Sequence, residues 1–292
     1  MTSETQAQTT APVLPASLRV GTVELTVTDL DRSVHFYETA IGLQLHGCKG
    51  NRAALGGGGE DLLALVEDPA ARPAGRHSGL YHFALLHPSR LELARAAARL
   101  AVTRTRISGA SDHNISEAIY LDDPDGNGIE LAADRGRETW GDISDPTVLG
   151  GPAPLDLAGL MSLVENEAPQ PYISPDTIVG HVHLHVGDID RALAFYRDVI
   201  GFEVMTLLDS AAFIAAGGYH HHLGLNIWRG RGAPPVPAGV VGLRHWTIVI
   251  PDDAAAALRE RVIVAGAPYE DTPEGLLVRD PWDIPLLVVA AG

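Results

Sequence analysis

Residues 179–191 read VGHVHLHVGDIDR, and residues 20–32 read VGTVELTVTDLDR. Each copy alternates apolar and polar residues, as a half-buried strand does. An Asp follows that can cap a helix of about one dozen residues, which Gly42 or Gly201 ends. The same offset also aligns two later pairs, Phe36-Tyr37 with Phe195-Tyr196 and Ile41-Gly42 with Ile200-Gly201. The second half of the chain therefore repeats the first.

Short apolar runs after each helix predict further strands and complete a βαβββ module. These runs are 52–55 and 62–66 in the first half and 212–215 and 220–228 in the second. A second unit of the same kind begins at 80–85 and at 243–248. The sequence therefore predicts an α+β fold of four modules, which we name A (18–68), B (79–134), C (177–229) and D (241–290).

The segment between modules B and C has the composition of a linker. It contains Pro and Gly clusters around a short predicted helix, 155–166. The N-terminus is polar and rich in Thr and Gln, which is typical of a disordered tail. The predicted divisions are the tail (1–17), the first half (18–134), the linker (135–176) and the second half (177–292).

Composition narrows the class of protein. The 292 residues are 46% hydrophobic and carry a formal net charge of −16, with one cysteine, Cys48. This charge argues against nucleic acid or an anionic membrane as the partner, since a phosphate-binding surface needs clustered Lys and Arg. No run approaches the roughly 18 apolar residues of a membrane span. We expect a cytoplasmic protein that binds a small molecule, and a homo-oligomer is compatible with the sequence.

The duplicated βαβββ modules, with the strand-Asp-helix-Phe-Tyr-Ile-Gly order quoted above, resemble the vicinal oxygen chelate superfamily of glyoxalase I, fosfomycin and bleomycin resistance proteins and extradiol dioxygenases. The resemblance implies that two modules pair into a cupped mixed sheet. It also implies metal ligands on the first and last strands of the modules. His82 and Glu130 occupy these positions in module B, and His181 occupies the first-strand position in module C.

Two imidazoles and one carboxylate resemble the facial triad of non-haem Fe(II) enzymes, which leaves coordination positions open. The other modules are incomplete: Thr22 and Leu287 replace the ligands expected in A and D, although His245 matches His82. The complete set needs B to pair with C and A with D, and we favour this cross-pairing over sequential pairing of A with B and C with D.

Further motifs resemble the Bacillus-type catechol 2,3-dioxygenase branch. The resemblance implies that Tyr120, ten residues before Glu130, and His113 hydrogen-bond the developing charge. It assigns the acid–base role to His221, with His222 as the second candidate. The implied reaction is extradiol ring cleavage of a small aromatic diol by dioxygen, with Fe(II) as cofactor and Mn(II) as the alternative.

Other readings of these residues stay open. Glu130 could be the exposed residue of an alternating strand, and 220–222 a polar strand end or a second metal site. His183 and His185 could form a polar rim of the pocket. The whole protein could instead be a glyoxalase-type isomerase or lyase that uses Zn, Ni or Mn without oxygen, or a non-enzymatic resistance protein that sequesters an aromatic ligand.

Overall fold

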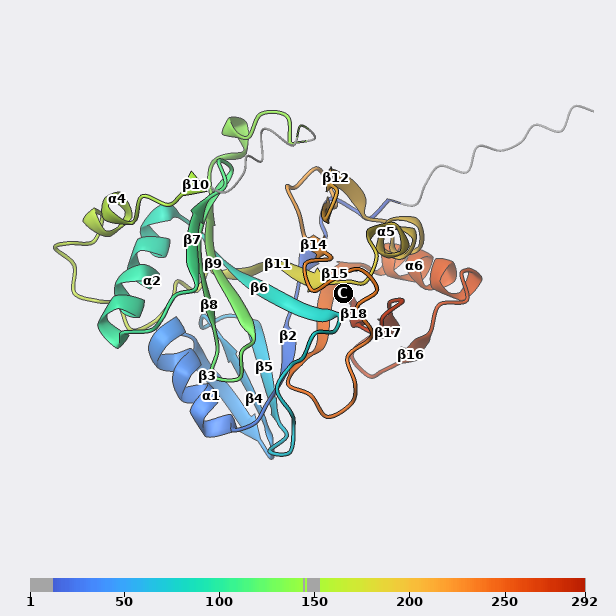
Figure 1. The fold of residues 1–292 in the computed structure, drawn as a ribbon, viewed down its shortest axis with the longest axis horizontal. Coiled ribbons are helices and arrows are strands. Elements are labelled where there is room, and N and C mark those ends of the chain that lie inside the picture. Colours follow the sequence, from blue (N-terminus) through green and yellow to red (C-terminus); the bar gives the residue numbers. More distant parts are fainter. Residues whose placement is uncertain (1–12, 144, 146–152, 292) are drawn as a thin grey trace, which may run out of the picture.

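The computed structural model describes residues 13–143, 145 and 153–291 (Figure 1). Within these residues the chain forms two mixed β-sheets of nine strands each. Helices lie on the outer sides of the sheets, at the left and right of Figure 1. None of the described helices is long and apolar enough to cross a membrane.

The first sheet combines modules A and D, and we call it the A–D sheet. Its central strands, β15 and β2, run antiparallel, and each has a parallel neighbour on its other side. In sheet order the strands are β16 (Tyr269–Asp271), β17 (Leu276–Arg279), β18 (Pro285–Ala291), β15 (Gly242–Pro251), β2 (Val23–Val27), β5 (Asp61–Glu67), β4 (Arg52–Gly56) and β3 (Gln44–Lys49), and β1 (Arg19–Val20) also pairs with β15.

The second sheet, the B–C sheet, combines modules B and C with the same pattern around the antiparallel pair β6 and β11. The predicted cross-pairing is therefore confirmed. In sheet order the strands are β10 (Ala153–Pro154), β7 (Gly109–Asp112), β8 (Ser116–Asp122), β9 (Gly128–Asp134), β6 (Gly79–His87), β11 (Ile178–His185), β14 (Leu223–Asn226), β13 (Ala211–Ala215) and β12 (Glu203–Leu208).

The repeated helices begin and end as the sequence indicates. The Asp29 and Asp188 carboxylates accept the backbone N–H three residues on, and Gly42 and Gly201 end the helices with φ of 85° and 105°. The last turn of each is a π-helix. The helical elements are α1 (Leu30–Phe36), η1 (Tyr37–Ile41), α2 (Arg90–Thr103), η2 (Arg137–Thr139), α4 (Leu157–Ser162), α5 (Ile189–Phe195), η3 (Tyr196–Ile200) and α6 (Asp252–Val264).

The two modules of each half, A with B and C with D, meet on the helical side instead of within a sheet. The buried Tyr37 hydroxyl of module A donates to Asp123 of module B at 3.0 Å. The repeat places the Tyr196 hydroxyl of module C 3.1 Å from Asp280 of module D. Since buried polar groups need partners, these bonds connect modules A to B and C to D while the sheets connect the two halves.

The predicted linker is partly structured. Strand β10 pairs with β7, and the Asp156 carboxylate caps α4 by accepting the Gly159 N–H at 2.9 Å. Helix α4 packs against α2. Most of the predicted tail, residues 1–12, lies outside the described residues. Its end is packed, because Leu14 is buried and its N–H donates to the Gly201 carbonyl.

Candidate metal centre and cavity

Three adjacent strands of the B–C sheet bring the predicted ligands together. His82 lies on β6, His181 on its antiparallel neighbour β11, and Glu130 on its parallel neighbour β9. The Glu130 Oε2 atom lies 3.0 Å from His82 Nε2 and 3.1 Å from His181 Nε2, and the two nitrogens are 3.4 Å apart. All three side chains are buried. Within the described residues they form the one group of three His, Cys, Asp or Glu side chains whose donor atoms could share an ion.

These separations fit a divalent metal ion. Nitrogen and oxygen ligands at about 2.1 Å from an ion lie about 3.0 Å apart on adjacent octahedral positions and about 3.4 Å apart on a tetrahedron. Burial alone would raise the pKa of Glu130, but the neighbouring His181 and His82 hold it well below its usual range. Burial lowers the pKa of His82 against the opposing effect of Glu130. An ionised carboxylate between neutral imidazoles is the form that binds a metal.

Tyr120 and His113 lie beside this cluster. Tyr120 faces Glu130 across the β8–β9 pair, and its hydroxyl lies 2.8 Å from His113 Nε2. Burial, with the nearby charge of Glu130, raises the pKa of the Tyr120 phenol. Tyr120 therefore stays protonated at neutral pH and can donate a hydrogen bond.

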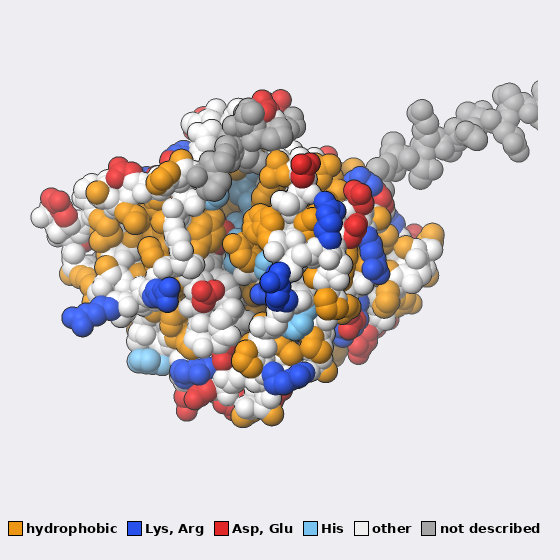
Figure 2. Space-filling view, viewed as in Figure 1, with side chains coloured by type: hydrophobic (Ala, Val, Ile, Leu, Met, Phe, Trp, Pro, Cys, Tyr) orange, Lys and Arg blue, Asp and Glu red, His pale blue; other side chains and the backbone are white. Residues whose placement is uncertain are grey.

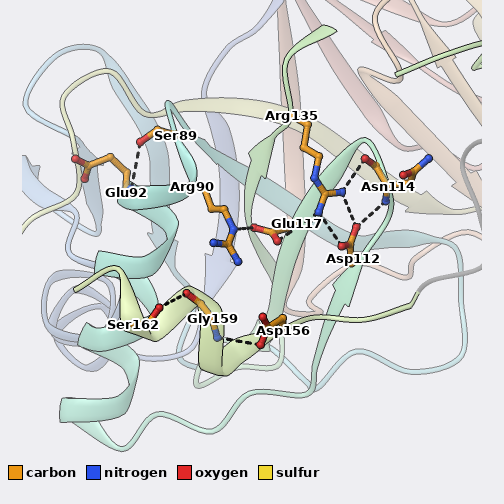
Figure 3. Close-up of polar contacts among 10 residues, drawn as sticks. All are labelled: Ser89, Arg90, Glu92, Asp112, Asn114, Glu117, Arg135, Asp156, Gly159 and Ser162. Carbon is orange, nitrogen blue, oxygen red and sulfur yellow. Dashed lines mark hydrogen bonds and ion pairs between the residues drawn. The ribbon is translucent and has the colours of Figure 1, made fainter. Parts of the chain in front are cut away.

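An ion-pair network holds the turn that carries His113. The turn joins β7 to β8 and places Asn114 at a φ of 69°, in the left-handed region. Figure 3 shows Arg135 between Asp112, Glu117 and the Asn114 carbonyl, with Asp112 Oδ1 at 2.6 Å. The hydrogen bonds from Arg135 lower the pKa of Asp112 to about 2. The guanidinium thus fixes both ends of the turn.

The structure separates the two acid–base candidates. The His221 ring lies 4.1 Å from the His181 ring, centre to centre, and lines the cavity described below. His222 does not line it: its Nδ1 accepts the Ala216 N–H at 3.2 Å. Both residues precede β14, which begins at Leu223, so the predicted strand over 220–228 is shorter than expected. Gly217 and Gly218, both at positive φ, turn the chain before the histidines.

A hydrogen-bonded chain leads away from His221. Its Nδ1 lies 2.8 Å from Nδ1 of His220, and His220 Nε2 lies 3.1 Å from the Asp134 carboxylate at the end of β9. The Tyr219 hydroxyl donates to the same carboxylate at 2.8 Å. Because a carboxylate only accepts hydrogen bonds, His220 Nε2 carries a proton and a neutral His220 accepts through Nδ1. His221 then holds its own proton on Nδ1 and keeps Nε2 as the basic nitrogen.

The cluster opens into a cavity of about 520 Å³. Figure 2 shows histidine side chains in a hollow near the top of the view, with hydrophobic side chains beside it. Strand β7, which is next to one edge of the sheet, and strand β12, which forms the other edge, both reach the cavity, so the sheet is curved around it. The lining residues are Tyr81, His82, Ser108, Gly109, Ser111, His113, Ile115, Ser116, Tyr120, Glu130, His181, His183, Thr206, Leu208, Phe213, His221 and Trp228.

Comparison with known proteins agrees with this architecture. The model of the Glyoxalase/Bleomycin resistance protein/Dioxygenase superfamily matches residues 19–131 and 178–283. The chain belongs to this superfamily. It is 44% identical over 268 residues to a catechol-2,3-dioxygenase of Bacillus subtilis (strain 168), covering 90% of this chain and 93% of that protein.

Solved structures share the fold of this superfamily member. Glyoxalase I from Zea mays superposes with a TM-score of 0.58 at 18% identity, covering 94% of this chain and 92% of the other. The cppA protein from Streptococcus pneumoniae TIGR4 superposes with a TM-score of 0.60 at 15% identity, covering 94% of this chain and all (100%) of the other. At these identities the likeness concerns the fold alone.

The A–D sheet of this superfamily member has an ion-pair cluster at the matching place. His245 Nδ1 lies 3.8 Å from Glu24, whose carboxylate accepts hydrogen bonds from Arg52 and Arg244 at 2.9 Å each. Burial acts to raise the pKa of Glu24, but the two arginines and His245 lower it overall. The Thr22 hydroxyl donates to a backbone carbonyl. The two arginines thus already pair with the carboxylate that a metal ion would need as a ligand.

Sequence reasoning identified only part of the cavity wall. His183 lines the cavity, is buried, and has no hydrogen-bond partner for Nε2 within the described residues. The sequence analysis left His183 open as part of a polar rim, because a spacing of two from His181 on one strand places both residues on the same face. The aromatic neighbours Tyr81, Phe213 and Trp228 come from three separate segments, and no local pattern predicts that they meet.

Proposed function

We propose that the protein is an extradiol dioxygenase, which cleaves the ring of a catecholic compound beside its two hydroxyls with Fe(II) and dioxygen. The observation that carries the proposal is the buried His82–Glu130–His181 cluster at the wall of a 520 Å³ cavity. The 44% identity to a catechol-2,3-dioxygenase supports the reaction. Two imidazoles and one carboxylate favour iron among the common divalent metals.

The three ligands would hold the ion on one side and leave its other side toward the cavity. When bound, Fe(II) supplies electrons for the activation of dioxygen and a Lewis acid that lowers the pKa of the substrate hydroxyls. Glu130 contributes the negative charge of the set. The surrounding strands keep the ligand positions fixed without large rearrangement, because all three strands are hydrogen-bonded neighbours.

His221 is the proposed acid–base residue. Burial, together with the neighbouring histidines, lowers its pKa well below the usual value, so its ring is neutral and Nε2 can accept a proton from a substrate hydroxyl. His220 accepts the Nδ1–H of His221 and itself donates to Asp134. This chain orients the His221 ring and stabilises the imidazolium that forms, as a carboxylate does behind a catalytic histidine.

Tyr120 and His113 are proposed to stabilise negative charge that develops on the ring oxygens. Both groups line the cavity beside Glu130, and the ion pair of Arg135 with Asp112 holds the turn that positions His113. A preorganised donor in a buried site is worth more than the same donor in water, because little reorganisation is needed during the reaction.

The test is anaerobic purification, measurement of bound metal, and reconstitution with Fe(II) or Mn(II), followed by oxygen uptake with catechol and detection of a yellow ring-cleavage product. We expect one metal ion per chain and oxygen consumption that depends on it. Glu130→Ala should lose metal, whereas the matched His245→Ala variant of the A–D sheet should keep it. Bound metal without oxygen uptake with any catechol would refute the dioxygenase and favour an isomerase. A folded protein that takes up no metal would favour a binding protein.

A further inference from the structure

The charge of the cavity wall restricts the substrate. Among the described residues that line the cavity, Glu130 supplies the one carboxylate and no Lys or Arg is present. The remaining polar groups are His, Ser, Thr and Tyr side chains. Once the two hydroxyls face the metal ligands, a carboxylate elsewhere on the ring would therefore meet no Lys or Arg side chain in this cavity. An unpaired buried charge is strongly disfavoured.

A continuous aromatic wall runs from the metal cluster to the mouth of the cavity. The His183 ring lies 5.0 Å from the His82 ring, and Phe213 and Trp228 pack on His183 at 5.8 Å and 5.3 Å. Tyr81 lies 5.3 Å from Trp228. Trp228 is 51% exposed and Tyr81 39%, so this end of the wall reaches solvent.

Two more apolar side chains line the cavity, one from each end of the sheet. Ile115 comes from the β7–β8 turn, and Leu208 from the edge strand β12. A cavity of 520 Å³ lies in the range that holds drug-sized ligands, and an unsubstituted catechol is far smaller than these. Space lined by apolar groups remains once the two hydroxyls face the ligand cluster.

We propose that the cavity selects catechols that carry an uncharged apolar substituent and discriminates against catechols that carry a carboxylate. This inference rests on the proposed dioxygenase function. The substituent lies along the wall formed by Phe213, Trp228 and Leu208, while the hydroxyls face His82, His181 and Glu130. Burying each added methylene should raise kcat/KM by up to about fourfold.

The first test compares kcat/KM of the iron-loaded protein for catechol, for 3- and 4-alkylcatechols of increasing chain length, and for the dihydroxybenzoates. We expect kcat/KM for at least one alkylcatechol series to exceed that for catechol. For the dihydroxybenzoates, kcat/KM should be at least about 100-fold lower than for catechol. Dihydroxybenzoates as good as catechol, or alkyl chains without benefit in either series, would overturn the inference but leave the dioxygenase standing. No turnover of any of these compounds would overturn both.

A variant pair tests the missing cation directly. Leu208 is 42% exposed, so Leu208→Arg places a guanidinium at the rim without burying it. This change should raise the ratio of dihydroxybenzoate to alkylcatechol kcat/KM by about fivefold, the strength of a partly exposed ion pair. The matched Leu208→Gln variant loses the same apolar contact without gaining a charge, so it is the reference against which this fivefold change in the ratio is measured. Equal ratios in the two variants would refute the charge argument.

Discussion

Asp280, the carboxylate that joins modules C and D, should make stability depend on pH. Its side chain is buried and accepts hydrogen bonds from the Trp282 and Ile284 N–H groups at 2.8 Å each and from the Tyr196 hydroxyl at 3.1 Å. Burial outweighs these bonds and raises the pKa from 3.8 to about 6. The folded protein therefore holds this proton more tightly than the unfolded chain.

The sign and size of the effect follow from proton linkage. The stabilisation from protonated Asp280 is fully present below about pH 3.8 and is lost as the pH rises through about 6. The whole shift corresponds to about 3 kcal/mol, of which roughly 1.4 kcal/mol is lost between about pH 5 and 7.5. Asp280→Asn keeps an acceptor for the two N–H groups and an amide beside Tyr196, but it has no proton to lose.

The assay is urea unfolding of both proteins at pH 5 and at pH 7.5, followed by circular dichroism. Between pH 5 and pH 7.5, the free energy of unfolding of the wild type should fall by about 1.4 kcal/mol more than that of Asp280→Asn, which corresponds to about 3–6 °C in Tm. Asp209→Asn, in an exposed turn, serves as the control and should show no such change. A difference independent of pH would refute the reasoning. A wild type that gains stability with pH would show that the three hydrogen bonds outweigh burial.

Three further changes test the site. Tyr120→Phe should lower kcat about 100-fold with metal content unchanged, as the loss of one preorganised donor does, and a parallel loss of metal would contradict this. Asp134→Asn should lower kcat about 10–100-fold and alter the pH profile of kcat, because the orientation of the histidine chain changes. A lower Tm with an unaltered pH profile would show that Asp134 has only a structural role. Gly224→Ala would place a methyl group 2.7 Å from Cγ of His183. The substitution should lower the free energy of unfolding by about 1–3 kcal/mol and raise KM. An unchanged KM would show that His183 does not contact the substrate.

Much of the fold could be predicted because the second half of the sequence repeats the pattern of the first. The repeat identified equivalent strands and helices, and the helix caps at Asp29 and Asp188 are local signals. The cross-pairing of modules was predicted from chemistry, since only B with C completes a ligand set. The π-helical last turns were not predicted, because the spacing of apolar residues is the same for an α-helical and a π-helical turn.

The site was predictable only in part. The metal ligands lie on the first and last strands of their modules, and the resemblance to the superfamily predicts ligands at these positions. The hydrogen bond from His220 to Asp134 joins residues 86 positions apart in different modules, which no local spacing indicates. The same holds for the place of His222, because the turn at Gly217 and Gly218 decides which of the consecutive histidines faces the cavity.

The cross-paired sheets make the fold compatible with circular permutation of the chain. Val20 of β1 and Val288 of β18 flank Ile248 of β15 on its two sides, so the first and last strands lie about 10 Å apart in one sheet. A short peptide could join them, and new ends could open between modules A and B. In that permuted order the neighbours along the chain would be the sheet partners, B with C and D with A.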